Sequence, residues 1–223
     1  MRNTRIVRRW LAPAAWSTVL TVLLTGCAAG DGDSDTAAGR AGASASATAK
    51  VAARGGSVGA AGSACELPVT FDVAEFWKAK AVDAAGATGD LADLADALLH
   101  QGPVTMACEI DAKPAGKIGF LRVWTGEPGD ADARSVLKAF VAAEQGASKA
   151  AYRAFTSGGV KGAEVEYVTT SELLDESKTE HAFAVTTPKG PVVLHLGGMD
   201  TGEHDAMLPA YELAKSTLRV SAA

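Results

Sequence analysis

Two histidines near the carboxyl terminus belong to the densest set of possible metal ligands in the sequence. Other candidate ligands lie between them or beside them: Met199, Asp200, Glu203 and Asp205. A zinc site needs three or four donors that converge on one point. His195 falls in a predicted strand, whereas His204 falls near the start of a predicted helix. The simpler interpretation makes Asp200 or Asp205 a helix N-cap and Glu203 an anion favoured by the helix dipole, so no metal site is predicted.

The sequence offers two further starting points for catalysis. Glu164 and Glu166 would project from one face of a strand, where paired carboxylates could exchange protons. Carboxylates at that spacing without partners are typical of a face in contact with solvent. His100 and His181 have no serine or cysteine nucleophile in a suggestive context. The sequence therefore predicts no catalytic residue, no cofactor and no enzymatic activity.

Aromatic side chains suggest a binding role instead. Phe120, Trp124 and Tyr167, with Trp77, could line an apolar ligand pocket against a sheet, although aromatic residues more often fill a core. We expect a domain that binds a protein or a small apolar ligand. The alternative is a carrier of a lipid or a metal ion, which would need an enclosed tunnel lined by Phe120, Trp124 and Tyr167 or a set of converging ligands.

The amino terminus has the three zones of a secretory signal. Four arginines precede an apolar stretch over 11–24, which Pro13 interrupts and which is too short for a confident membrane-spanning helix. The stretch ends in Leu24-Thr25-Gly26-Cys27. These four residues resemble the lipobox of bacterial lipoproteins. The resemblance implies that residues 1–26 are removed and that Cys27 carries a diacylglyceryl group and a fatty acyl chain such as palmitate.

Anchoring by lipid fits the charge of the chain. The full sequence has 21 Lys and Arg against 26 Asp and Glu, and loss of the four signal arginines makes the balance more acidic. An acidic protein lacks the basic surface that nucleic acid requires, so no nucleic-acid partner is expected. We predict attachment to the extracytoplasmic face of the cell membrane through Cys27, because two or more acyl chains hold a protein stably. The export route, general secretory or twin-arginine, stays open.

The other two cysteines are expected to pair. Outside the cytoplasm disulfides persist, and Cys65 and Cys108 are the cysteines that remain once Cys27 is lipidated. The chain-entropy model assigns roughly 4 kcal/mol to a loop of this length. The alternative is two buried free thiols.

Residues 27–64 are almost entirely small or polar. Such a segment cannot bury enough surface to offset its conformational entropy, so we expect a lipidated N-terminus followed by a disordered tether spanning roughly 35 Å. The globular domain is predicted over 65–223. The abundance of Ala, Gly and Val with few Ile and Asn residues is typical of a GC-rich genome and suggests an actinobacterial source.

Apolar periodicity predicts the elements of this domain. Strands are expected over 69–73, 77–82, 104–111, 117–124, 163–170, 181–187 and 192–196. Helices are expected over 90–101 and 132–145, over a short segment from Ser148 to Phe155, and over a last segment carrying Met207, Tyr211, Ala214 and Leu218. Pro209 must lie in the first turn of that last helix or kink it. Hairpins outnumber crossovers, which favours an α+β fold with a largely antiparallel sheet and packed helices.

The order of these elements resembles the PsbP-like fold and the actinobacterial surface lipoproteins of the LpqN type. Two stretches carry the resemblance: Pro68-Val69-Thr70-Phe71-Asp72-Val73 with Trp77 close behind, and Ala182 to Val185 followed by Val192 to Leu196 and a terminal helix. This chain has Ala74-Glu75-Phe76 where the group would have a proline and a glycine. The resemblance implies a binding or accessory protein and supplies no functional residue.

The lipobox interpretation predicts the behaviour of a Cys27→Ser variant. Serine has no thiol to accept the diacylglyceryl group, so the variant should stay unlipidated and uncleaved at this site. Mass spectrometry and membrane fractionation would follow the lipid and the location. An unlipidated variant that stays as firmly in the membrane fraction by other means would contradict the lipid anchor.

Overall fold

The computed structural model describes residues 50–83 and 98–221 of the chain. Its main sheet has the order β3-β5-β6-β10-β9-β8-β7, and every pairing within it is antiparallel. The strands are β3 (Lys78–Ala81), β5 (Val104–Asp111), β6 (Gly119–Thr125), β10 (Gly190–Gly198), β9 (Glu176–Thr187), β8 (Val160–Ser171) and β7 (Ala147–Ser157), with β4 (His100–Gln101) paired to β5. A small sheet joins β1 (Arg54–Val58), β2 (Val69–Ala74) and β11 (Arg219–Val220).

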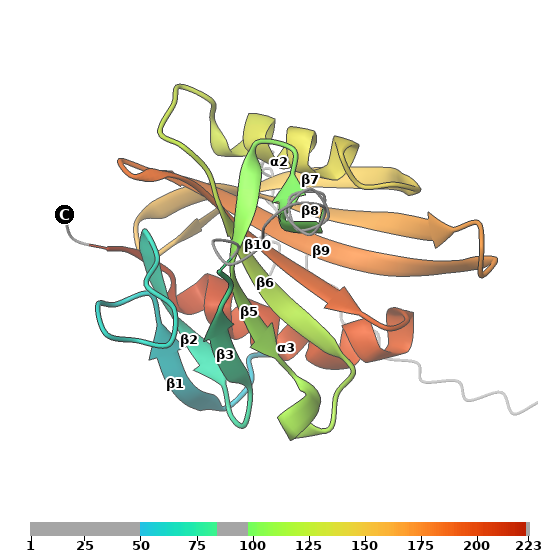
Figure 1. Cartoon of the computed structure of the whole chain (residues 1–223), viewed down its shortest axis with the longest axis horizontal. Helices are drawn as coiled ribbons and strands as arrows, with labels where there is room; N and C mark the ends of the chain where they lie inside the picture. The colour runs from blue at the N-terminus through green and yellow to red at the C-terminus, as the bar shows by residue number, and fades with distance from the viewer. Residues whose placement is uncertain (1–49, 84–97, 222–223) are drawn as a thin grey trace, which may run out of the picture. The chain divides into compact units, whose positions relative to one another are not determined.

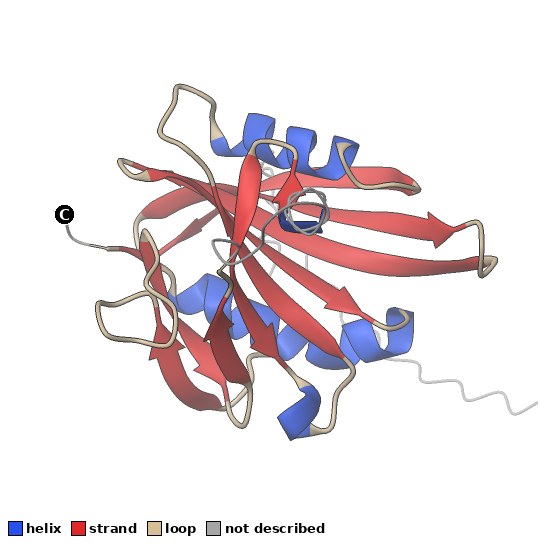
Figure 2. Cartoon of the chain, in the orientation of Figure 1, coloured by secondary structure: helices blue, strands red, loops and turns tan. Residues whose placement is uncertain are grey.

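Two helices cover opposite faces of the main sheet, with α2 (Ala133–Ala142) above and α3 (Thr201–Thr217) below in the view of Figures 1 and 2. Successive side chains of the central strands point to opposite faces of the sheet, so the same strands contribute apolar residues to both cores. In β9, Phe183 and Val185 join the core under α3, whereas Ala182 and Ala184 join the core under α2. The predicted α+β class with a largely antiparallel sheet is therefore confirmed.

Both helices begin after an aspartate N-cap: Asp200, one of the two caps that the sequence offered for the last helix, and Asp132, where the helix over 132–145 was expected to start. The Asp132 side chain accepts a hydrogen bond from the Ser135 N–H, and the Asp200 side chain accepts one from the Glu203 N–H. Pro209 lies inside α3 rather than in its first turn, and its carbonyl accepts a hydrogen bond from the Ala52 N–H. None of the helices in the described ranges is long and apolar enough to cross a bilayer.

The short helix predicted from Ser148 to Phe155 is wrong, because this segment forms the edge strand β7. Gly158 and Gly159 adopt positive φ angles of 55° and 84° and turn the chain tightly into β8. β7 then pairs with β8 along most of its length. These backbone hydrogen bonds override the helix propensity of its alanines.

The predicted tether ends earlier than Ala64. β1 pairs with β2, and Val58 is buried in the main core, so the folded body already includes residues 54–58. Gly59 follows with φ +100°, and a Cβ there would collide with the Val69 carbonyl, so only glycine lets the two backbones approach. Cys27, the signal segment, the tether before residue 50 and most of the predicted helix over 90–101 lie outside the described residues, while His100–Gln101 is strand.

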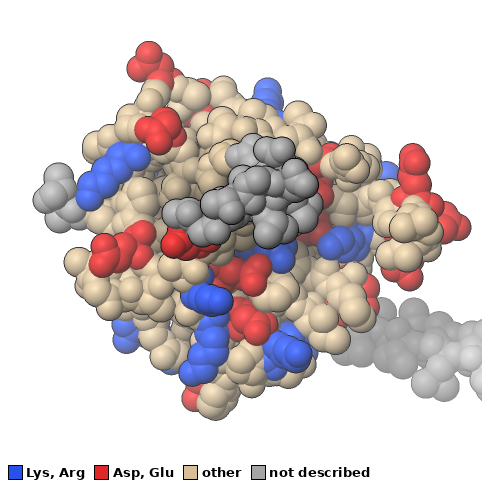
Figure 3. Space-filling view, viewed as in Figure 1, with Lys and Arg blue, Asp and Glu red and all other residues tan. Residues whose placement is uncertain are grey.

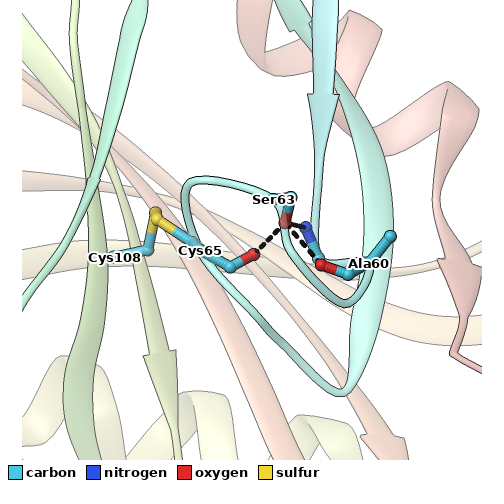
Figure 4. Close-up of a disulfide and its surroundings, with 5 residues drawn as sticks. Ala60, Ser63, Cys65 and Cys108 are labelled. Carbon is cyan, nitrogen blue, oxygen red and sulfur yellow. Dashed lines mark hydrogen bonds between the residues drawn. A yellow bond between two sulfur atoms is a disulfide. The ribbon is translucent and has the colours of Figure 1, made fainter.

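Cys65 and Cys108 form a disulfide in the structure, as predicted (Figure 4). The bridge joins the loop before β2 to the middle of β5, with a Cα–Cα distance of 5.9 Å and both cysteines buried. The Ser63 hydroxyl orders that loop, because it lies 2.6 Å from the Ala60 carbonyl and 2.7 Å from the Cys65 carbonyl. The small sheet is thus fixed covalently to the main one.

Replacing Cys108 by serine should lower the free energy of unfolding by about 4 kcal/mol, because the unfolded chain loses its cross-link. Urea unfolding with and without a reducing agent would measure the loss. The reducing agent should shift the parent protein toward the variant and leave the variant unchanged. An unfolding midpoint that neither change moves would contradict a stabilising disulfide.

Candidate functional site

A hollow of about 780 Å³ lies on the α2 side of the main sheet, over β5, β6, β10 and β9. Its lining includes Phe120, Arg122 and Trp124 from β6, and His195 and Gly197 from β10. The strand register places these residues side by side, with Trp124 opposite Val193, Arg122 opposite His195 and Phe120 opposite Gly197. Since alternate residues of a strand share a face, all of these side chains belong to the same side of the sheet.

Gly197 leaves the floor of the hollow open. A Cβ at this position would meet only Glu180 Oε2 at 3.4 Å and His195 Cε1 at 3.5 Å, which are ordinary contacts. Its neighbours across the sheet, Phe120 on β6 and Glu180 on β9, therefore face each other over a position without a side chain. A larger side chain at this position would project into the hollow.

A buried polar chain forms one wall of the hollow. His195 Nε2 lies 2.9 Å from Glu180 Oε2 and 3.1 Å from the Tyr167 hydroxyl, and Lys178 Nζ lies 2.7 Å from Glu180 Oε1. Burial alone would raise the pKa of Glu180, but the hydrogen bond from His195 and the Lys178 ammonium outweigh it and lower that pKa. Glu180 stays ionised with both oxygens occupied. These contacts hold the four side chains in place, so they form a fixed polar wall of the hollow.

A second polar pair stands beside this chain. Arg122 Nε donates to Glu109 Oε2 at 2.9 Å, and its guanidinium carbon lies 4.8 Å from the centre of the Phe120 ring. Both side chains of the pair are about one-third exposed. The ion pair and the aromatic ring hold the guanidinium in one orientation within the hollow.

The three aromatic residues predicted to bind ligand are only partly brought together. Phe120 and Trp124 line the hollow, whereas Tyr167 lies in the core beneath α2 and reaches the lining through its bond to His195. Trp124 packs edge-on against Phe140, with ring centres 5.6 Å apart, and its Nε1 is buried without a hydrogen-bond partner among the described residues. These three residues do not line one enclosed tunnel of the kind that a carrier would need. Their role in ligand binding stays a prediction.

The candidate metal ligands are separated by the sheet. His195 points to the α2 side, whereas His204 on α3 bonds to His181 on the other side. Asp200 caps α3, and the Glu203 side chain accepts a hydrogen bond from the Ile118 N–H. In the part of the chain that the structure describes, no three His, Cys, Asp or Glu side chains are grouped to hold a metal ion.

The α3 side holds a polar cluster that the sequence did not predict. Glu164 is 1% exposed and accepts hydrogen bonds from Arg153 and Lys215, both at 2.9 Å, so its assignment to a solvent face was wrong. His181 Nδ1 and His204 Nε2 lie 2.7 Å apart between the sheet and α3. The sequence did contain a signal for this cluster. Glu164 and His181 are polar residues at positions where apolar residues are expected, because they lie on the same face of the sheet as Phe183 and Val185.

Burial governs the charge of the histidine pair. It lowers the pKa of His181 and, together with the nearby His181 ring, lowers the pKa of His204 to about 4. Glu166 Oε2, 3.4 Å from His181 Nε2, acts in the opposite direction on His181. Near neutral pH the pair is therefore uncharged, with one ring donating to the other.

A family model described as an uncharacterised lipoprotein matches residues 35–218. Four chains of solved structures match, among them the solution structure of cyanobacterial PsbP (CyanoP) from Synechocystis sp. PCC 6803. That protein is 16% identical, the match covers 74% of this chain and 98% of that one, and the TM-score is 0.46. No curated protein matches.

The histidine pair predicts a loss of stability in weak acid. In the unfolded state this histidine binds a proton near pH 6.5, whereas folded His204 binds one only near pH 4. The stabilising contribution of neutral His204 to folding is therefore complete above pH 6.5 and is lost as the pH falls toward 4. The loss should be on the order of 3 kcal/mol. Urea unfolding measured across this range would show it. His204→Gln, which keeps a hydrogen-bonding side chain without the titrating proton, should flatten the dependence; equal slopes in this variant and the parent protein would contradict the assignment.

Proposed function

This chain belongs to the uncharacterised lipoprotein family, and on that premise we propose that it is an accessory protein of the cell membrane, held on the extracytoplasmic face by lipid on Cys27. The basic start, the apolar stretch and Leu24-Thr25-Gly26-Cys27 support the anchor. The family match over residues 35–218 supports the assignment independently, because it does not include that motif. The segment after Cys27 then connects the folded body to the membrane.

The folded body acts, in this proposal, as a non-catalytic binding domain for a small ligand with an apolar part. The hollow around Gly197 is the observation that carries it. Its volume of about 780 Å³ lies in the range of small-molecule sites, and its lining combines apolar side chains with a few fixed polar groups. The polar groups are already paired with one another, which suits them to orienting a ligand rather than to transferring protons.

A protein partner is the second candidate function. Leu173 and Leu174, at the turn between β8 and β9, are 93% and 66% exposed. Exposed apolar side chains of this size are typical of contact surfaces when they cluster, but two residues give a small area. Binding of a small ligand in the hollow is therefore the first candidate function.

A neutral apolar dye, N-phenyl-1-naphthylamine, tests the small-ligand function. The protein should enhance the fluorescence of the dye saturably, with a stoichiometry near one. Gly197→Leu should weaken binding at least about tenfold, because its side chain would project into the hollow from a Cβ that meets no backbone atom within 4 Å.

Gly129→Leu is the matched control. Gly129 lies in an exposed loop where a Cβ would meet nothing within 4 Å, so the same substitution there should leave dye binding unchanged. Thermal unfolding should show that both variants are folded. Absence of binding to the parent protein, or equal binding by folded Gly197→Leu and Gly129→Leu variants, would contradict the proposal.

A further inference from the structure

We propose that the ligand of the hollow is an uncharged amphiphile: an apolar body joined to a head that both donates and accepts hydrogen bonds. This inference rests on the proposed small-ligand function and adds the chemistry that the site would recognise. Two features of the lining carry it, an exposed apolar rim and a pair of opposite charges that neutralise each other.

The apolar rim accounts for the body of the ligand. Leu98, Ile118 and Met199 all line the hollow, yet 64%, 54% and 60% of their surfaces are exposed. Ile118 and Met199 are held next to each other, because the Met199 N–H donates to the Ile118 carbonyl at 3.0 Å. Burying such side chains against a ligand would gain roughly 25 cal/mol per Å². Three large apolar residues at one site therefore favour a ligand with an apolar portion.

The Arg122–Glu109 pair accounts for the head. Their bond uses one guanidinium donor, Nε, and one carboxylate oxygen, Oε2. Arginine has further donors and glutamate a second oxygen, and each side chain is about one-third exposed. A head placed here can accept from Arg122 and donate to Glu109 at the same time. Hydroxyl-rich and amide heads have both abilities.

The charge balance of the lining argues against a charged head. Arg122 is paired with Glu109, and Lys178 is paired with Glu180, so each cation has a carboxylate within 3 Å. The remaining carboxylate of the lining, Glu144, accepts a hydrogen bond from Gln101 Nε2 at 2.9 Å. An anionic head near Arg122 would lie beside Glu109, and a cationic head near Glu109 would lie beside Arg122. Acidic and basic side chains are likewise interspersed on the face shown in Figure 3. An uncharged head avoids this repulsion.

Three ligands with the same decyl chain test the head: decyl glucoside, decanoate and decylamine, which are neutral, anionic and cationic near pH 7. Each would displace N-phenyl-1-naphthylamine from the parent protein below its micelle concentration. We expect decyl glucoside to bind about tenfold more tightly than either charged compound. Decanoate or decylamine binding as tightly as decyl glucoside would overturn the inference.

Two variants make the test specific to the ion pair. Glu109→Gln leaves the Arg122 charge without its partner, so the preference should move toward decanoate by about tenfold. Arg122→Gln leaves the Glu109 charge and should move the preference toward decylamine by a similar factor. A purely structural role of the pair would not shift the two preferences in opposite directions, so the absence of these shifts also overturns the inference.

The outcomes separate this inference from the function on which it rests. If the dye binds and Gly197→Leu blocks it, but the three heads compete equally, then only the head chemistry is wrong. If the dye does not bind the parent protein, then the small-ligand function fails and this inference fails with it.

Discussion

The main sheet has two apolar faces, and both must be covered. The helix α3 runs for 17 residues, about 25 Å, along one face and packs against the larger core. On the other face α2 has 10 residues, about 15 Å, whereas β8 and β9 each extend for 12 residues, about 40 Å. Among the residues that the structure describes, a helix this short shields only part of the sheet, and the hollow lies beside it.

Burial on both faces also explains the two polar groups inside the domain. Glu180 on one side and Glu164 on the other are almost fully buried, and each receives two hydrogen bonds from basic side chains. Removing a charged group from water is tolerated only with such partners. On the α3 side the partners bind helix to sheet. On the α2 side the partners of Glu180 form a wall of the hollow. The need to pair a buried carboxylate therefore produces a structural cluster on one face of the sheet and part of the hollow's lining on the other.

Local patterns in the sequence predicted much of this fold, and the elements that were not predicted have one cause in common. The cap at Asp200, the helix that starts at Asp132, the hairpin from β9 to β10 and the Cys65–Cys108 bridge follow from neighbouring residues or from cysteine chemistry. The strands β1 and β7 do not, because their Gly- and Ala-rich sequences become strands only through pairing with β2 and β8. The hollow was equally hidden, since it needs Arg122, Gly197 and Glu180 from three strands in one register. Of its lining residues, only Phe120 and Trp124 were predicted from the sequence to bind an apolar ligand.

The central claim is that a ligand occupies the space above Gly197, and amide chemical-shift mapping tests it most directly. Decyl glucoside added to the 15N-labelled protein should move the Gly197 amide, the Arg122 Nε–H and the Trp124 indole N–H together, with a single dissociation constant. Shifts confined to the β8–β9 turn around Leu173 and Leu174, with the signals of Gly197, Arg122 and Trp124 unchanged, would contradict the account.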